Sequence, residues 1–89
     1  MKTYKLTVSS PDGNVFSGEC VKFDARGTEG EFAIMAGHVP FVTSVVKGKC
    51  VITLEDGSRL NAVTEGGLIT VGTDKVNFIS GSFKITDRE

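Results

Sequence analysis

The segment that decides the fold class is Lys49-Cys50-Val51-Ile52-Thr53-Leu54-Glu55-Asp56-Gly57-Ser58-Arg59-Leu60-Asn61-Ala62-Val63-Thr64-Glu65. Two short runs rich in valine, isoleucine, leucine and threonine flank an Asp-Gly pair, which is among the strongest short-range signals for a tight β-hairpin. We therefore predict a strand over residues 49–54, a turn over 55–58 and a strand over 59–65 that pairs back with the first.

The same succession of strands and turns extends in both directions from this hairpin. Near the N-terminus, Tyr4, Leu6 and Val8 alternate with polar residues, which predicts a strand with one buried face. Glycine, proline and aspartate turns separate further apolar runs. These runs occupy residues 15–16, 21–25, 32–35, 41–46, 68–71, 76–79 and 83–85.

The pattern predicts an all-β protein, a single-domain flattened β-sandwich of about nine to ten mainly antiparallel strands over residues 1–89. No window keeps the spacing of an amphipathic helix. We expect Gly18 to interrupt the second strand as a β-bulge. We also expect Phe32, Ile34 and Met35 to return to the core, and Gly66-Gly67 to allow a sharp corner or a close backbone approach.

Composition excludes several classes of function. The ten basic and eleven acidic residues are spread along the chain, so no basic cluster marks a nucleic-acid-binding surface. No apolar run approaches the roughly 20 residues that span a bilayer, so we expect membrane association only through a protein partner. Cys20 and Cys50 have no zinc-site spacing, and we expect two reduced thiols in preference to a disulfide.

Candidate catalytic and metal-ligating residues are sparse. The single histidine, His38, lacks a surrounding nucleophile and carboxylate, so we expect it to hydrogen-bond within its loop or to face a partner. One histidine and two distant cysteines do not make a metal site. We expect Glu29 and Glu31 to present negative charge at a loop tip. Acid–base catalysis is less expected, because it needs a desolvated cleft. We therefore expect no enzymatic activity, no metal and no cofactor.

A glycine-rich stretch carries a family resemblance. It reads Gly27-Thr28-Glu29-Gly30-Glu31-Phe32-Ala33-Ile34-Met35-Ala36-Gly37-His38-Val39-Pro40-Phe41-Val42-Thr43. This stretch resembles the pattern G-x-x-G-E-F-x-I-x-P-G-H-x-P-x-x-T in the amino-terminal β-sandwich of the epsilon subunit of F-type ATP synthases. The segments 9–19 and 66–76 are also similar to that family, in the same order. Ala36 departs from the pattern, because proline is usual at that position.

The resemblance implies a non-catalytic rotor subunit in the central stalk of a proton-translocating ATP synthase. Such a subunit couples rotation of the membrane c-ring to the gamma subunit during ATP synthesis. It would be a peripheral protein on the cytoplasmic face of the bacterial inner membrane, or alternatively of the chloroplast thylakoid. The inhibitory pair of C-terminal helices common in the family is not expected, because the sequence ends at Glu89.

The resemblance also implies two sets of contact residues. Thr28, Glu29 and Glu31 correspond to the loop that faces the c-ring. Ser10, His38 and Thr43 correspond to positions that face gamma in the family. Phe41 and Val42 are apolar candidates either for that contact or for the core. The alternative function is a stand-alone ligand- or carbohydrate-binding sandwich, although the absence of tryptophan and the single tyrosine leave few stacking platforms.

Overall fold

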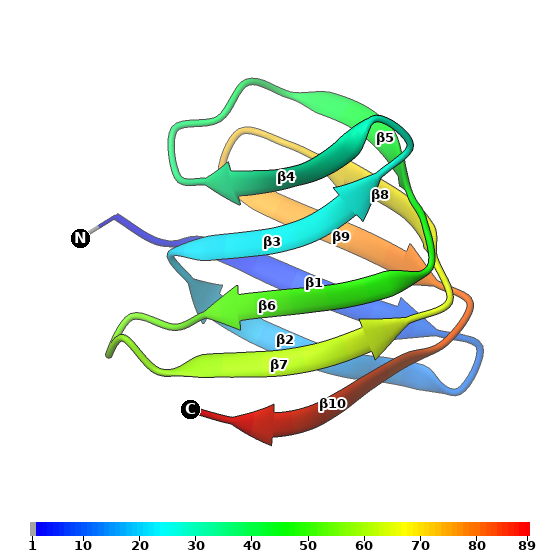
Figure 1. Ribbon diagram of the computed structural model, residues 1–89. Helices are drawn as coiled ribbons and strands as arrows, with labels where there is room; N and C mark the ends of the chain where they lie inside the picture. The colour runs from blue at the N-terminus through cyan, green and yellow to red at the C-terminus, as the bar shows by residue number, and fades with distance from the viewer. Residues whose placement is uncertain (1) are drawn as a thin grey trace.

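A computed structural model describes residues 2–89, which form ten β-strands arranged as a sandwich (Figure 1). The predicted all-β class and strand number are confirmed. No helix in the described part of the chain is long and apolar enough to cross a membrane. The strands are β1 (Tyr4–Ser10), β2 (Gly13–Cys20), β3 (Lys22–Gly27), β4 (Gly30–Met35), β5 (Phe41–Val45), β6 (Gly48–Thr53), β7 (Arg59–Thr64), β8 (Gly67–Val71), β9 (Lys75–Ser80) and β10 (Phe83–Arg88).

The strands form two five-stranded sheets. The first sheet has the order β2-β1-β9-β8-β5 and the second has the order β10-β7-β6-β3-β4. Paired strands are antiparallel except β1 and β9, which run parallel at the middle of the first sheet. The consecutive strands β4 and β5 are edge strands of different sheets, and residues 36–40 carry the chain from one sheet to the other (Figure 1).

The hairpin over residues 49–65 forms as predicted. Strand β6 pairs antiparallel with β7, with Cys50 opposite Ala62 and Ile52 opposite Leu60. Gly57 adopts a positive φ of 89°, a conformation that glycine tolerates without steric cost. The Asp56 carboxylate accepts a hydrogen bond of 2.9 Å from the Ser58 amide, which is the local bonding expected of aspartate in a turn.

The core lies between the two sheets and draws on both. Leu6 of β1, Phe23 of β3, Ile52 of β6 and Phe78 of β9 are all fully buried. The Phe23 and Phe78 rings, from opposite sheets, lie 5.9 Å apart between centroids. Cys20 and Cys50 are free thiols and are buried in this same core. Side chains that alternate along each strand therefore meet across the sandwich, as period-two patterning requires.

Two predicted details are wrong. Gly18 pairs regularly with Leu6, and the irregularity instead lies between Val8 and Ser9, where β2 contributes one extra residue, Val15. The bulge therefore falls next to the β1–β2 turn. Met35 is 55% exposed, because it follows the buried Ile34 on β4 and the alternation of a strand turns it outward.

Candidate interaction surfaces

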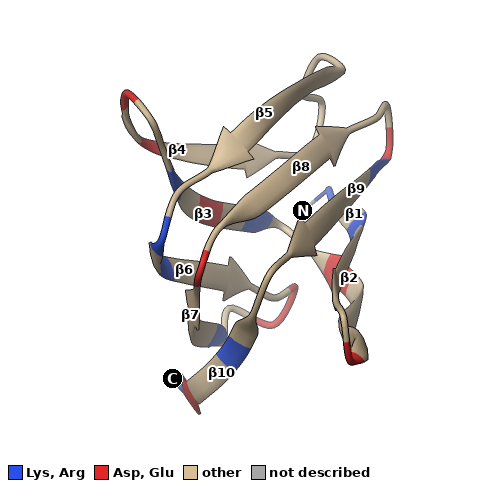
Figure 2. Ribbon diagram, turned by 90° about the vertical axis from the view of Figure 1, so that its right-hand side faces the viewer, with Lys and Arg blue, Asp and Glu red and all other residues tan. Residues whose placement is uncertain are grey.

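The acidic loop predicted from the sequence is the tip of the β3–β4 hairpin. Gly27 pairs with Gly30 at the end of the ladder, and Gly30 has a φ of 126°, so the chain reverses over Thr28 and Glu29. Glu29 and Glu31 are both exposed. Neither carboxylate belongs to an ion pair within residues 2–89. The tip thus presents two exposed carboxylates that form no ion pair within the described residues (Figure 2).

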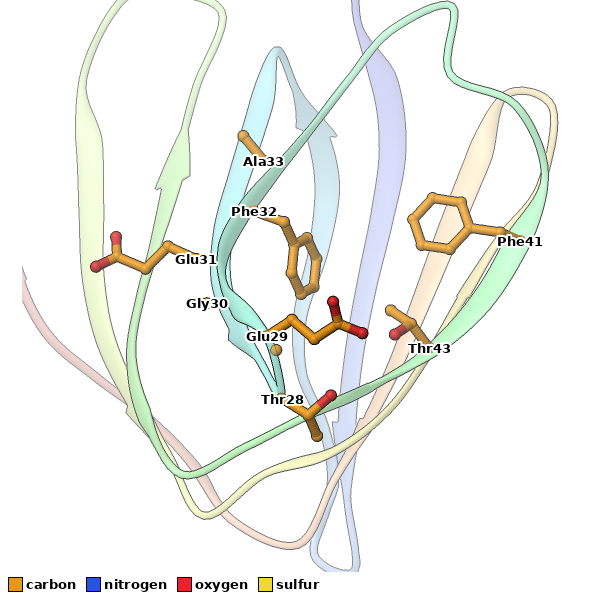
Figure 3. A pocket seen from close by; sticks show the side chains of 9 residues that line it. Thr28, Glu29, Gly30, Glu31, Phe32, Ala33, Phe41 and Thr43 are labelled. Atoms are coloured by element: carbon orange, nitrogen blue, oxygen red, sulfur yellow. The ribbon is translucent and has the colours of Figure 1, made fainter.

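An open pocket lies beside this tip, between the edge strands β4 and β5. Its volume is about 350 Å³. Phe32 of β4 and Phe41 of β5 point into it from opposite sides, and the carboxylate of Glu29 enters the same space (Figure 3). Thr43 lines the wall formed by β5, whereas the side chain of Glu31 points away. The pocket therefore combines two aromatic walls with one directed carboxylate.

His38 is half-buried, and its ring lies between two backbone carbonyl groups. Its Nδ1 lies 2.6 Å from the carbonyl oxygen of Met35, and its Nε2 lies 2.7 Å from that of Gly72. Both ring nitrogens are therefore engaged by backbone oxygens, so neither is available as a general base. A hydrogen bond inside the Gly37–Pro40 loop was expected, but both backbone partners lie outside that loop, at Met35 of β4 and at Gly72. The contact with Gly72 ties the loop to the β8–β9 turn.

The described residues include few other groups that could bind a metal, act as a nucleophile or stack on a ligand. Among residues 2–89, no cluster of three or more histidine, cysteine, aspartate or glutamate side chains could hold a metal ion. Burial raises the pKa of the Cys50 thiol to about 12 and also raises the pKa of Cys20, so both thiols are poor nucleophiles. Tyr4 is buried, so it cannot stack on a sugar ring at the surface.

The residues matched to gamma contacts do not form one continuous patch. Phe41 and Thr43 face inward and line the pocket, whereas Val42 points outward from β5 and is 60% exposed. Ser10 ends β1, while His38 lies beside the start of that strand. Because β1 rises about 3.3 Å per residue, roughly 20 Å of strand separates Ser10 from the neighbourhood of His38.

A larger candidate surface is the outer face of the first sheet, which we call the neutral face. Two rows of outward side chains cross this sheet. One row runs through Val42, Thr70, Asn77, Thr7 and Ser17, and the other runs through Ser44, Leu68, Ile79, Ser9 and Asn14. None of these ten residues is charged. The charged outward residues of β1, β2 and β9 are Lys5, Glu19 and Lys75, and they share a single row at one end.

The outer face of the second sheet has the opposite character. Figure 2 shows charged residues on β3, β6 and β10 but none on β5 and β8. The outward charged residues of the second sheet are Lys22, Asp24, Arg26, Glu31, Lys49, Arg59, Lys84 and Asp87. A charged outer face is what solvent contact favours, so the neutral face is the one suited to a protein partner.

The two apolar residues at the centre of the neutral face were not predicted from the sequence. Leu68 is 45% exposed and Ile79 is 60% exposed, and they lie opposite each other on β8 and β9. A signal was present, because Leu68 precedes the buried Ile69 and Ile79 follows the buried Phe78. An apolar residue next to a buried one in a strand must face outward.

Comparison with solved structures finds the same fold in two mitochondrial ATP synthases. A chain of the Euglena gracilis enzyme, solved by cryo-EM as the OSCP/F1/c-ring part, superposes with a TM-score of 0.88 at 24% identity, over 93% of this chain and 53% of that one. A chain of the central stalk and c-ring of the Tetrahymena thermophila enzyme gives a TM-score of 0.72 at 11% identity, over 89% and 63%. The present chain thus spans between half and two thirds of the length of these matches.

Sequence comparison with family models identifies the group. The model that matches describes the β-sandwich domain of the ATP synthase delta/epsilon chain, and it aligns with residues 3–85. That alignment includes the β3–β4 tip, the pocket and the whole neutral face. The chain belongs to the family of ATP synthase delta/epsilon chain β-sandwich domains.

Proposed function

We propose that this chain acts as a non-catalytic central-stalk subunit of a rotary ATP synthase and couples rotation of the c-ring to the gamma subunit. In this proposal, residues 1–89 are one domain that works as a rigid coupling piece. Membership of the delta/epsilon family supports the assignment to the stalk. The neutral face is the observation that carries the proposal of a large protein contact.

The neutral face suits gamma because a permanent interface must exclude water. The cores of protein interfaces are depleted in charge and enriched in apolar side chains, since an unpaired charge is costly to desolvate. Leu68 and Ile79 provide the apolar centre, Val42 adds an apolar side chain on the edge strand β5, and the surrounding hydroxyl and amide groups can hydrogen-bond across the contact. We assign gamma to this face, with Val42 as its contact on β5.

The acidic tip suits the c-ring for a different reason. Thr28, Glu29 and Glu31 lie on a narrow hairpin that reaches beyond the sheets, and their charges can orient a docking event with polar loops. Contact through the tip would place the domain at the membrane surface as a peripheral component of the complex. The particular membrane, bacterial or thylakoid, is set by the enzyme in which the chain assembles.

The architecture is consistent with mechanical coupling. Ten paired strands and one close-packed core resist shear through many hydrogen bonds that would have to break together. Tyr4, at the start of β1, donates a hydrogen bond of 2.6 Å to the carbonyl oxygen of Ile34 on β4, so the two sheets are also joined directly. A domain of this kind transmits torque without changing shape.

The test compares two substitutions at sites of equal exposure. Leu68 on the neutral face and Val63 on the outer face of the second sheet are 45% and 44% exposed. Leu68→Glu places a charge in the proposed interface, so the tagged chain should retain at least tenfold less gamma on purification. Val63→Glu places the same charge between Lys49 and Lys84, its cross-strand neighbours, and should retain gamma as the parent chain does.

Proton-driven ATP synthesis by reconstituted complexes provides the second readout. Synthesis should fall with the loss of gamma in the Leu68→Glu variant and stay at the parent level in the Val63→Glu variant. Equal retention of gamma by both variants, with normal synthesis, would exclude the neutral face as the gamma contact. Failure of the parent chain to co-purify with any stalk or ring subunit would contradict the function itself.

A further inference from the structure

The pocket beside the β3–β4 tip has the walls of a site for a flat cationic group. Phe32 and Phe41 approach it from different sheets and direct their rings into the same space (Figure 3). Aromatic faces attract cations that lie over them, through the negative potential of the ring. The pocket is open because β4 and β5 are the edge strands of their sheets. A side chain from another protein can therefore enter without displacing any strand.

The charge of the pocket favours a cation over a neutral or anionic group. Glu29 directs its carboxylate between the two rings and the wall at Thr43 (Figure 3). No lysine or arginine lines the pocket, whose residues are Gly27, Thr28, Glu29, Gly30, Glu31, Phe32, Ala33, Phe41 and Thr43. None of the ion pairs within residues 2–89 involves Glu29, so this carboxylate has no ionic partner in the described part of the chain.

Arginine matches these groups better than lysine does. Its planar guanidinium can stack on a phenylalanine ring while its edge donates two parallel hydrogen bonds to one carboxylate. The aliphatic stem of the side chain can pack on the second ring. The hydroxyl of Thr43 provides a further acceptor on the pocket wall. The ammonium of lysine, by contrast, is a point charge that is more strongly hydrated.

We propose that this pocket receives an arginine side chain from a partner protein, held between Phe32 and Phe41 and paired with Glu29. The inference deepens the function proposed above, because an arginine in this position would fix the tip on the subunit that it contacts. It rests on that function only for the identity of the protein that supplies the arginine. The pocket itself can be tested on the isolated chain.

The experiment titrates the ¹⁵N-labelled chain with three blocked tripeptides, Gly-Arg-Gly, Gly-Lys-Gly and Gly-citrulline-Gly. Citrulline keeps the shape of arginine and removes its charge. Gly-Arg-Gly should shift the amide signals of residues 27–33 and 41–43, with a dissociation constant on the order of 10 mM, as expected for one partly exposed ion pair with ring stacking. Gly-Lys-Gly should bind more weakly, and Gly-citrulline-Gly should leave these signals unmoved.

Two neighbouring carboxylates provide a matched control. Glu29→Gln removes the charge that enters the pocket and should weaken binding of Gly-Arg-Gly about fivefold. Glu31→Gln removes a charge whose side chain points away, and should change binding less than twofold (Figure 3). Phe41→Leu, at a side chain that is 39% exposed, should preserve the fold and weaken binding by a similar factor to Glu29→Gln.

Several outcomes would overturn the inference. Equal shifts with arginine and citrulline, equal weakening by Glu29→Gln and Glu31→Gln, or no shifts at 50 mM peptide would each do so. These outcomes are separate from the test of function, because the peptide titration needs neither gamma nor the c-ring. Normal retention of gamma by the Leu68→Glu variant, with peptide binding intact, would refute the neutral face as the gamma contact and leave the pocket standing.

Discussion

Tyr4 and His38 meet edge to face, with their ring centroids 5.2 Å apart and their planes at 86°. Each residue also bridges the two sheets. The Tyr4 hydroxyl, on the first sheet, donates to the carbonyl oxygen of Ile34 on the second. The His38 ring lies between the carbonyl oxygens of Met35 on β4 and Gly72 in the β8–β9 turn. Together they close the end of the sandwich at which the chain passes from β4 to β5.

The bridge predicts that His38→Gln destabilises the isolated fold. A carbonyl oxygen only accepts hydrogen bonds, so the ring nitrogen that carries a proton donates to the oxygen of Met35 or of Gly72, and the flexible side chain of glutamine lacks the rigid ring that holds this donor in place. The free energy of unfolding, measured with urea, should fall by about 1 kcal/mol for the lost bond. Val39→Gln, in the same loop at a side chain that is 75% exposed, should change it by less than about 0.5 kcal/mol.

The result would distinguish a role of His38 in stabilising the fold from a role only in contact with a partner. A His38→Gln chain as stable as the parent, but unable to retain gamma, would show that the imidazole acts only at an interface. Equal destabilisation by Val39→Gln would show that the loop, and not the imidazole, responds to substitution.

The glycine pair at the start of β8 predicts a second stability effect. A Cβ built on Gly67 would collide with the carbonyl oxygen of Ile79 and lie 2.9 Å from the Cα of Ser80, and both atoms belong to the backbone of the neighbouring strand. Gly67→Ala must therefore push β8 and β9 apart, and we expect it to cost about 3 kcal/mol. In Gly81→Ala, by contrast, the added Cβ comes no closer than 3.9 Å to the nearest contact, the Gly66 carbonyl oxygen, so this variant should cost less than about 1 kcal/mol.

Urea unfolding of the two glycine variants would measure the difference. Gly81 is a suitable control because its amide bonds to the Gly66 carbonyl at the same corner of the fold, with a length of 3.0 Å. If Gly67→Ala were no more harmful than Gly81→Ala, the close approach of β8 and β9 at this point would be refuted.

Local patterning was sufficient to predict the strands and their buried faces. Tyr4, Leu6 and Val8 all fall in the core because their alternation is a property of one strand alone. The Asp56-Gly57 turn was predictable for the same reason, since its chemistry lies within a few residues. The parallel pairing of β1 with β9 was not predictable, because it joins segments about 70 residues apart with no local signal.

The candidate surfaces also combine features that the local sequence predicts with features that depend on distant segments. Glu29 and Glu31 were placed at a tip because the surrounding glycines mark a turn. The aromatic pocket depends on Phe32 and Phe41 arriving from different sheets, and the Gly72 partner of His38 lies 34 residues away. Such contacts depend on the packing of the two sheets, which no single segment specifies.

A buried pair of hydroxyl groups predicts energetic coupling between the sheets. Thr64 of β7 and Ser80 of β9 are 4% and 2% exposed, and their hydroxyl oxygens lie 2.6 Å apart. Thr64→Val or Ser80→Ala alone should cost about 1–2 kcal/mol, because each breaks this bond and also removes the acceptor of a backbone amide, that of Gly66 at Thr64 and that of Ser82 at Ser80. The double variant should be less destabilised than the sum of the two, by about 1 kcal/mol in a double-mutant cycle from urea unfolding. Strict additivity would mean that the two hydroxyls do not interact.

The buried ionisable groups predict that the fold weakens at alkaline pH. Burial raises the pKa of the Cys50 thiol from 9.0 to about 12, and it also raises the pKa of Tyr4 and of Cys20. Above pH 9 the unfolded chain therefore loses these protons while the folded chain keeps them, which favours unfolding. Stability should be fully present below pH 9 and decline as the pH rises toward 12. Cys50 alone should account for a loss of about 2 kcal/mol between pH 8 and pH 11.

Urea unfolding at pH 8 and pH 11 would test this for the parent chain and for Cys50→Ala. The alanine variant should be less stable at pH 8, because it removes core volume, yet it should lose less stability on going to pH 11. Ser58→Ala, in an exposed turn, should lose as much stability between pH 8 and pH 11 as the parent chain does. If the parent chain and Cys50→Ala lost the same stability between pH 8 and pH 11, the thiol would ionise as easily in the folded chain as in the unfolded one. Its burial between the sheets would then not oppose its deprotonation.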